Sequence, residues 1–255
     1  MSFNIWTPDA LSSECFSAAG TCWRVVEAQH HVSTAKLTDS AEEQTRLEEL
    51  IEESKPPVPD ECRGLHLLLL TPFRYGAPYP TGSRFRRAGM SLGVFYASMN
   101  VETAVAEMAF YRLLFFAESP DTPWPTNPGE YTAFSAEFAT GRAVDLTLPP
   151  LNEHQSIWTN KTDYSGCQAF ADAARSAALD VIKYQSVRCP SRGINVAILS
   201  CRVFTKADVG ERQTWRIQLS STGARVICEF PKLVLNFGRD SFAEDARMSE
   251  MNWDR

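Results

Sequence analysis

The sequence lacks most of the short motifs that identify common enzyme classes. Its 255 residues contain no G-x-G-x-x-G fingerprint, no P-loop, no G-x-S-x-G elbow and no C-x-x-C pair. These absences argue against the usual dinucleotide and triphosphate cradles, an α/β-hydrolase elbow and a zinc or thioredoxin-like motif. Histidine is scarce, with four residues and no H-x-x-x-H spacing, and adjacent His30 and His31 are predicted to be surface or capping residues. The sequence therefore predicts no metal site.

Long apolar runs and an excess of positive charge are also missing. No window reaches the roughly 18 apolar residues of a membrane span, and the first residues, MSFNIWTPDALSSE, have no signal-peptide pattern. The net charge of −6 gives no bulk reason to expect nucleic acid or membrane as a partner. Seven cysteines, an odd number without close pairs, are typical of reduced thiols. We therefore expect a cytoplasmic protein, and its 44% hydrophobic content suffices for a sizeable core.

An amphipathic helix is predicted over residues 40–54. Ser40 and Glu43 form a capping box, and Leu47, Leu50 and Ile51 recur at helical spacing beside an acidic face. The proline-rich stretch at residues 55–59 then ends the helix. These signals divide the chain into an N-terminal helical extension (1–60), a main domain (61–237) and a polar tail (238–255), which we expect to be mobile.

The main domain alternates short strand patterns with a few helices. Residues 65–71, LHLLLLT, predict a buried strand that places Arg74 and Tyr75 at its end. Further strands are predicted at residues 22–28, 93–97, 131–138, 141–146, 181–187 and 194–204, helices at 101–118 and 166–178, and a hairpin at 215–230. Because only some strand pairs are joined by helices, the expected fold class is α+β, with a mixed, mainly antiparallel split sheet and helices.

The helix predicted at residues 101–118 carries a carboxylate beside its apolar stripe. Ala104, Met108, Tyr111 and Phe115 recur at helical spacing and are expected to face the core. Glu107 lies about 60° from the centre of that stripe, at about 100° per residue. We expect it to be partly buried, and a partly buried carboxylate needs either a partner or a chemical role.

Four kinds of site compete on the residues alone. Cysteine–histidine hydrolysis has candidate pairs, Cys62 with His66 and Cys167 with His154, but neither has a recognisable nucleophile context. Metal hydrolysis and a Ser-His-Asp triad lack their motifs. The remaining hypothesis is an arginine, tyrosine and carboxylate site for a phosphorylated ligand. Arginine binds phosphate oxygens in bidentate fashion, tyrosine stacks on planar rings, and a carboxylate stabilises an oxocarbenium-like sugar. A plain binding protein stays open as the alternative.

Several pieces, in order, resemble the RES-domain family, the toxin half of bacterial RES–Xre type II toxin–antitoxin pairs. The similarity runs from about residue 65 to 204. The matching pieces are Arg74-Tyr75, Gly82-Ser83-Arg84-Phe85 leading to Gly89, Val94-Phe95-Tyr96-Ala97-Ser98, Glu102-Thr103-Ala104-Val105-Ala106-Glu107, and Tyr184-Gln185-Ser186-Val187-Arg188. One departure lies at Arg86-Arg87, where the family usually has Asn.

The resemblance implies an ADP-ribosyltransferase-like fold and an NAD phosphorylase or NAD glycohydrolase. Members split the nicotinamide–ribose bond of NAD, with phosphate or water as the acceptor. Arg74, Glu107 and Ser186 match the catalytic trio, and Tyr75, Arg84 and Tyr96 match further binding positions. In this picture the arginines hold phosphates, Glu107 steadies the ribosyl cation, and Ser186 donates a hydrogen bond and is not a nucleophile.

The same resemblance sets the expected partners. NAD is the substrate, inorganic phosphate is a co-substrate, and no cofactor is implied. The expected protein partners are a cognate antitoxin that blocks the active site and a second copy in a homodimer. Two alternatives stay open, namely ADP-ribosyl transfer to a macromolecule and a non-catalytic NAD or ADP-ribose binding module.

Overall fold

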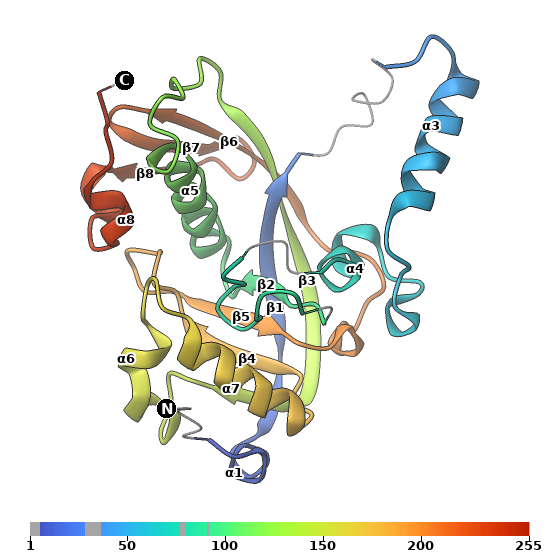
Figure 1. Ribbon diagram of the computed structural model, residues 1–255, viewed down its shortest axis with the longest axis vertical. Helices are drawn as coiled ribbons and strands as arrows, with labels where there is room; N and C mark the ends of the chain where they lie inside the picture. The colour runs from blue at the N-terminus through green and yellow to red at the C-terminus, as the bar shows by residue number, and fades with distance from the viewer. Residues whose placement is uncertain (1–5, 29–36, 77–79, 91, 255) are drawn as a thin grey trace.

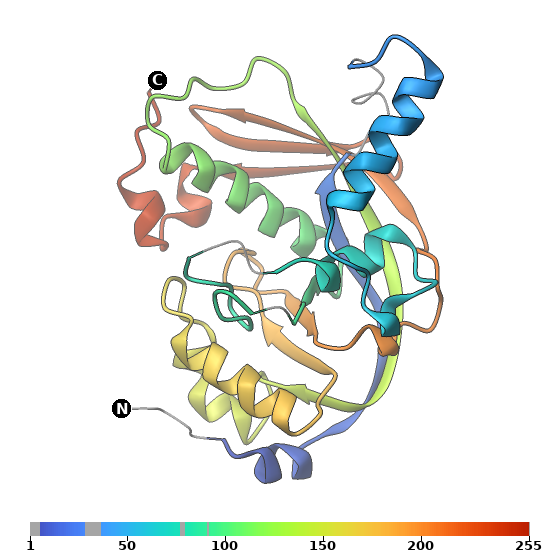
Figure 2. The ribbon, with the colours of Figure 1, turned by 45° about the vertical axis from the view of Figure 1, so that its right-hand side comes forward.

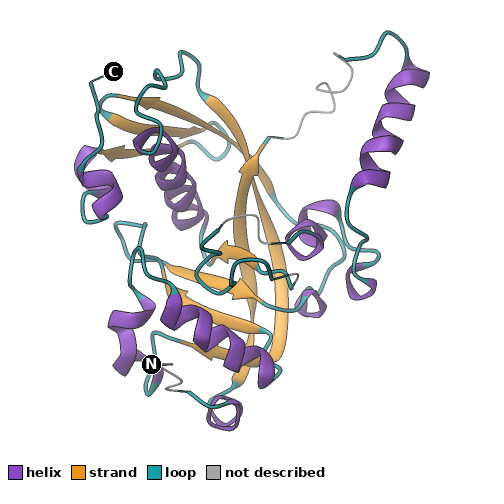
Figure 3. Cartoon of the chain, viewed as in Figure 1, coloured by secondary structure: helices purple, strands orange, loops and turns teal. Residues whose placement is uncertain are grey.

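The computed structural model of the chain describes residues 6–28, 37–76, 80–90 and 92–254 (Figure 1). His30 and His31 lie outside the described residues. In Figure 3 the two longest strands run through the centre of the molecule, and helices gather near both of their ends. Within the described residues no helix combines the length and apolar character that a membrane crossing requires.

The strands form one eight-stranded sheet in the order β1-β2-β5-β4-β3-β6-β7-β8, and β1 also pairs with β3. That extra pairing closes the first five strands of the order into a ring, whereas the sequence predicts a split sheet. Among the strands of the described residues, only β3 and β4 pair in parallel, so the sheet is mixed and mainly antiparallel, as predicted. The strands are β1 (Phe16–Glu27), β2 (Phe95–Ser98), β3 (Gly129–Asp145), β4 (Val181–Gln185), β5 (Ile194–Ile198), β6 (Arg212–Ser220), β7 (Gly223–Cys228) and β8 (Leu233–Gly238).

The long pairing of β1 with β3 is the backbone of the ring. It runs antiparallel from Phe16 opposite Ala143 to Glu27 opposite Tyr131. The sequence predicts two strands in the region of β3, separated near Gly141. The structure shows one strand, because β1 continues alongside and supplies hydrogen-bonding partners through the expected break.

The helices are α1 (Pro8–Ser13), α3 (Ala41–Ser54), α4 (Leu67–Arg74), α5 (Val101–Ala117), α6 (Gln155–Trp158), α7 (Ser165–Ser176) and α8 (Ala246–Ser249), with 3-10 turns η1 (Asp60–Cys62), η2 (Leu151–His154), η3 (Cys201–Val203) and η4 (Arg239–Phe242). The three predicted helices all form, as α3, α5 and α7, and the structure adds α1, α4, α6 and α8. Ser40 Oγ caps α3 by accepting a hydrogen bond from the amide of Glu43 at 3.1 Å. No residue of α3 is buried, and the helix extends away from the sheet (Figures 1 and 2).

The prediction of a buried strand at residues 65–71 is wrong, because this stretch forms helix α4. His66 caps the helix, with its Nδ1 accepting a hydrogen bond from the amide of Leu68 at 3.1 Å. A continuous leucine run is compatible with a strand or a helix, and periodicity cannot separate the two. Arg74 and Tyr75 therefore stand at the end of a helix and not at the end of a strand.

Helix α5 packs into the main core, but its buried face differs from the predicted stripe. Phe110 and Leu113 are fully buried, whereas Tyr111 and Phe115 are 50% and 49% exposed. The helix is apolar on almost every side, so spacing alone does not identify the face that the sheet covers. Glu107 is partly buried, as predicted.

The segment after β8 packs against α5, contrary to the expectation of a mobile tail. Phe242, Met248 and Met251 are buried in the same apolar cluster as α5. The ring of Trp253 stacks on that of Trp124, with centroids 6.1 Å apart. The C-terminal segment is thus an integral part of the core on this side of the sheet.

Candidate active site

Glu107 lies where α5 meets the ends of two neighbouring strands of the ring. Its Oε1 accepts one hydrogen bond from Ser186 Oγ at 2.6 Å and another from Asn195 Nδ2 at 2.7 Å. Ser186 follows β4, and Asn195 belongs to β5. Within the described part of the chain, no hydrogen bond is recorded to Oε2. One carboxylate oxygen is therefore fixed by the protein while the other is available to a ligand.

Ser186 is only 1% exposed, and its hydroxyl is fully engaged. Besides donating to Glu107, its Oγ accepts hydrogen bonds from the amides of Arg188 at 3.2 Å and Cys189 at 2.9 Å. Gly193 lets this loop approach α5, because a Cβ there would lie 2.0 Å from Thr103 Oγ1. The structure thus brings Ser186 to Glu107, and its hydroxyl is placed to orient the carboxylate.

Asn195 and Ser98 are the residues of this network that the sequence analysis missed. Asn195 is 3% exposed and Ser98 is 2% exposed. Ser98 Oγ donates to Asn195 Oδ1 at 2.7 Å, which turns the amide nitrogen toward Glu107. An asparagine inside the apolar strand sequence INVAIL was an available signal, because a buried amide needs partners.

Tyrosines crowd the surroundings of Glu107. Burial first, and then the negative charge of Glu107, raises the pKa of Tyr184 well above its ordinary value. Tyr96, a predicted site residue, bonds its hydroxyl to Ser83 Oγ and accepts from the amide of Phe85, both at 2.9 Å. Tyr184 is therefore a neutral ring near the carboxylate, whereas the hydroxyl of Tyr96 bonds to the turn that carries Arg84.

Arg84 is held in a tight turn beside these tyrosines. Gly82 allows the turn, because its φ is +70° and a Cβ would lie 2.2 Å from the carbonyl oxygen of Arg86. The Arg84 side chain donates from Nη1 to the carbonyl oxygen of Trp158 at 2.7 Å, and its guanidinium lies 4.7 Å from the centre of the Tyr164 ring. Arg84 is 7% exposed.

Two further arginines, the buried Arg86 and the half-buried Arg175, flank the same turn. Arg86 donates to the carbonyl oxygens of Tyr75 and Met90, and Arg175 donates to that of Gly93. Burial lowers the pKa of both guanidinium groups. The Nε atoms of both are buried without a hydrogen-bond partner. Arg86 thus clamps the loop at the position where the sequence departs from the RES pattern.

Three arginines of this region carry positive charge without a direct carboxylate contact among the described residues. Among the described residues, Arg84, Arg86 and Arg175 form no ion pair, whereas neighbouring Arg87 pairs with Asp172 at 2.6 Å. A buried charge without a counterion is unfavourable. A bound anion near the turn would relieve that cost, and planar guanidinium groups match phosphate oxygens well.

Arg74, a predicted catalytic residue, bonds to the N-terminal extension. Its Nη1 lies 2.7 Å from Glu52 Oε1 of α3, and its Nε donates to the carbonyl oxygen of Pro56. The contacts of the described residues include none between Arg74 and Glu107 or Ser186. Tyr75, the next predicted residue, is 36% exposed, and its carbonyl oxygen is held by Arg86. The structure therefore brings together two of the three predicted catalytic residues.

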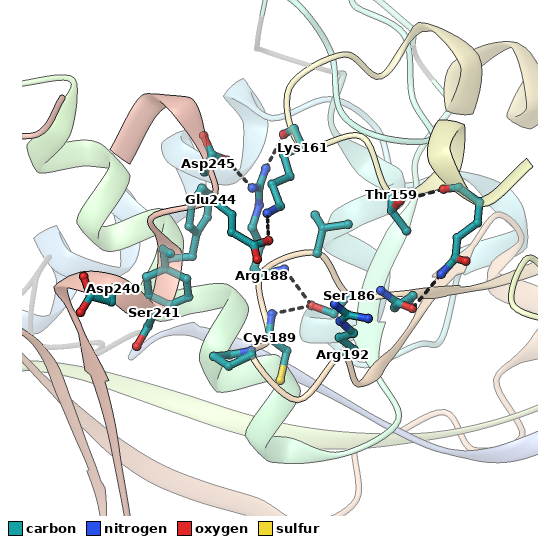
Figure 4. Close-up of a pocket in the computed structure, with 16 residues that line it drawn as sticks. Thr159, Lys161, Ser186, Arg188, Cys189, Arg192, Asp240, Ser241, Glu244 and Asp245 are labelled. Carbon is teal, nitrogen blue, oxygen red and sulfur yellow. Dashed lines mark hydrogen bonds and ion pairs between the residues drawn. The ribbon is translucent and has the colours of Figure 1, made fainter. Parts of the chain in front are cut away.

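A cavity of about 440 Å³ adjoins Ser186 (Figure 4). The loop after β4 forms one wall, and Asp240, Ser241, Phe242, Glu244 and Asp245 of the C-terminal segment form the opposite wall. Its charged groups are largely paired within the wall, Arg188 with Asp245 and Lys161 with Glu244. The C-terminal segment thus helps to shape the space next to the Ser186 loop.

The cysteine–histidine hypotheses find no support. Cys167 lies 3.8 Å from Arg84 Nη1, and burial raises the pKa of its thiol. The ring of His154 contacts Trp6 and Trp158. Within the described ranges, the only cluster with metal-ligand character is Glu61, Cys62 and Cys201. The two sulfur atoms of this cluster lie 2.7 Å apart, too close for both to bind one tetrahedral ion.

A sequence profile, and not a likeness to a solved structure, shows the family of this chain. None of the curated proteins matches the sequence. A solved structure that resembles this chain is the toxin–antitoxin complex MbcT–MbcA of M. tuberculosis, with 13% identity, 83% of this chain and 91% of the other covered, and a TM-score of 0.46. The RES domain profile matches residues 59–220, more than half of the chain. The chain therefore belongs to the RES domain family.

Proposed function

We propose that the chain is the toxin of a toxin–antitoxin pair and degrades NAD by cleaving the nicotinamide–ribose bond. Phosphate or water accepts the ribosyl group, so the activity is that of an NAD phosphorylase or NAD glycohydrolase on an ADP-ribosyltransferase-like fold. One observation carries the proposal. Glu107 has one carboxylate oxygen without a hydrogen bond among the described residues, and the charges of Glu107 and Arg84 both act on Tyr184, which lies between buried groups of the site.

The proposed cleavage requires a negative charge placed next to the ribose carbon that becomes cationic. As the bond between ribose C1′ and the pyridinium nitrogen breaks, its electron pair neutralises the nicotinamide ring and leaves an oxocarbenium-like ribose. The Glu107 carboxylate stabilises this cation, as carboxylates do in glycoside hydrolysis. A phosphate oxygen then attacks C1′ to give nicotinamide and ADP-ribose 1″-phosphate. With water as acceptor, the products are nicotinamide, ADP-ribose and a proton.

The binding residues follow from the same geometry. Arg84 holds a phosphate of NAD or the incoming phosphate, because its charge has no acidic partner among the described residues. Arg74 is the less suitable of the two predicted arginines, since it already pairs with Glu52. The rings of Tyr96 and Tyr75 line the nicotinamide pocket in this proposal. The hydroxyl of Tyr96 contributes to the turn and not to the substrate, because both of its bonds are internal.

Product analysis tests the proposal. The protein is incubated with NAD, with and without inorganic phosphate, and nicotinamide and ADP-ribose products are separated by chromatography. We expect nicotinamide in at least one condition, and a phosphorylated ADP-ribose only with phosphate. A folded protein that releases no nicotinamide in either condition contradicts the proposal.

Two alternative activities give different results in the same experiment. ADP-ribosyl transfer to a macromolecule would move the label of radioactive NAD into a protein or nucleic-acid band. A non-catalytic module would bind NAD or ADP-ribose in calorimetry without turnover. In the proposed role the protein acts in the cytoplasm, where it meets NAD, and its partner is an antitoxin that covers the cleft. A homodimer belongs to the same proposal.

Replacing Ser186 with alanine is expected to lower turnover about tenfold to hundredfold, because Ser186 orients the carboxylate of Glu107. The reason is that Glu107 loses one of its two hydrogen bonds, while no nucleophile is removed. Single-turnover kinetics with mass spectrometry measure the rate and search for a ribosylated protein. A covalent adduct on Ser186 in the wild-type protein would contradict this role.

A further inference from the structure

The hydrogen-bond network of Glu107 extends beyond Ser186 to Asn195 and Ser98. Asn195 Nδ2 donates to Glu107 Oε1 at 2.7 Å, and Asn195 Oδ1 accepts from Ser98 Oγ at 2.7 Å. All three side chains lie on different elements, α5, β5 and β2. Because Ser98 and Asn195 are paired neighbours across β2 and β5, their relative position is fixed by the sheet.

The direction of the asparagine amide matters for an ionised carboxylate. A turned amide would place Oδ1 against Glu107 Oε1, and two acceptors would face each other without a proton. The Ser98 hydroxyl prevents this arrangement by donating to Oδ1. Asn195 and Ser98 are both almost completely buried, so water cannot replace either bond.

We infer that Asn195 is a positioning residue for Glu107 and that Ser98 fixes the orientation of the Asn195 amide. This arrangement leaves Oε2 of Glu107 as the oxygen that meets the ribosyl cation. This inference rests on the proposed function. Ser186, in the loop after β4, and Asn195, in β5, donate to the same Oε1, so the carboxylate cannot rotate without breaking a buried hydrogen bond. Loss of a buried donor leaves its partner under-satisfied, and a small displacement of a reacting group costs much of the rate.

The test measures kcat and KM for nicotinamide release in Asn195→Ala, Asn195→Asp and Ser98→Ala. We expect Asn195→Ala to lower kcat by about tenfold to hundredfold with KM little changed. Asn195→Asp keeps the shape but replaces the donor with an acceptor near neutral pH, so it is expected to lose at least as much. Ser98→Ala is expected to lose less, and the double variant Ser98→Ala with Asn195→Ala to resemble Asn195→Ala alone, since both act through one path.

A matched control separates positioning from packing. Gln213 is a buried amide of β6 that bonds to Glu211 and Trp215, so Gln213→Ala disturbs the core without touching Glu107. Its kcat per folded molecule is expected to stay at the wild-type level. If the wild type releases nicotinamide and Asn195→Asp keeps full kcat, or if Gln213→Ala loses as much as Asn195→Ala, the inference is overturned. If the wild type releases none, it is the proposed function that fails.

Discussion

Replacing Glu107 with glutamine is expected to reduce nicotinamide release at least about a hundredfold, because the negative charge that faces the ribosyl cation disappears. The fold should persist. The glutamine oxygen can still accept the hydrogen bonds from Ser186 and Asn195, since both donors point at the same atom. Turnover is measured by chromatography of nicotinamide, and folding by circular dichroism and thermal denaturation.

The control for this variant is Glu102→Gln. Glu102 lies in the first turn of the same helix and is exposed, so the change removes an equal charge without altering the cleft. We expect turnover near the wild-type value. A Glu107→Gln protein that is folded and fully active would remove Glu107 from the mechanism.

Replacing Asp245 with alanine is expected to cause the largest loss of stability. Asp245 pairs with Arg188, and each side chain is only 2% exposed. It also accepts hydrogen bonds from the amide of Arg247 and from its guanidinium. Removing one partner of a buried ion pair typically costs about 3–5 kcal/mol because the other charge stays buried. Urea denaturation measures this change, and the melting temperature should fall by roughly 10 °C.

The matched control is Asp254→Ala. Asp254 pairs with Arg239 at the surface, so its loss should cost less than about 1 kcal/mol.

The pH dependence of the free energy of unfolding is a second test of the role of Asp245. Burial would raise the pKa of Asp245, but Arg247 and Arg188 hold it below its ordinary value of 3.8. The contribution of Asp245 is therefore present above about pH 4 and is lost as the pH falls through the folded-state pKa. A variant as stable as the wild type at neutral pH would contradict this account.

Some elements follow directly from local sequence signals. The capping residue Ser40 set the start of α3, and the turn at residues 220–223 set the hairpin of β6 and β7. The leucine run before Arg74 did not reveal its conformation, because its pattern fits both a strand and a helix. Closure of the ring depends on β1 meeting β3, which are distant in the sequence, and no local signal encodes that contact.

The site was only partly visible in the sequence for a related reason. Glu107 and Ser186 could be chosen from a resemblance, and the structure places them in contact. Asn195 could not be chosen in this way, because its role depends on hydrogen bonds to Glu107 and Ser98, which are distant from it in the sequence. Arg74 meets Glu52 of α3, a residue that the RES pattern does not include, and spacing gave no sign of that ion pair.

The closed ring affects how freely the chain can vary in length. The polypeptide leaves β1 after Glu27 and returns at Phe95 of β2, and these two strands are neighbours. Everything between them, including α3, α4 and the turn of Arg84, is an excursion whose ends the ring holds together. Because the entropy of closing a loop grows slowly with its length, insertions and deletions around α3, which has no buried residue, leave the ladder intact. In the proposed function, ligand preference can therefore change in this excursion while β5, which carries Asn195, and β4, which leads to Ser186, stay unchanged.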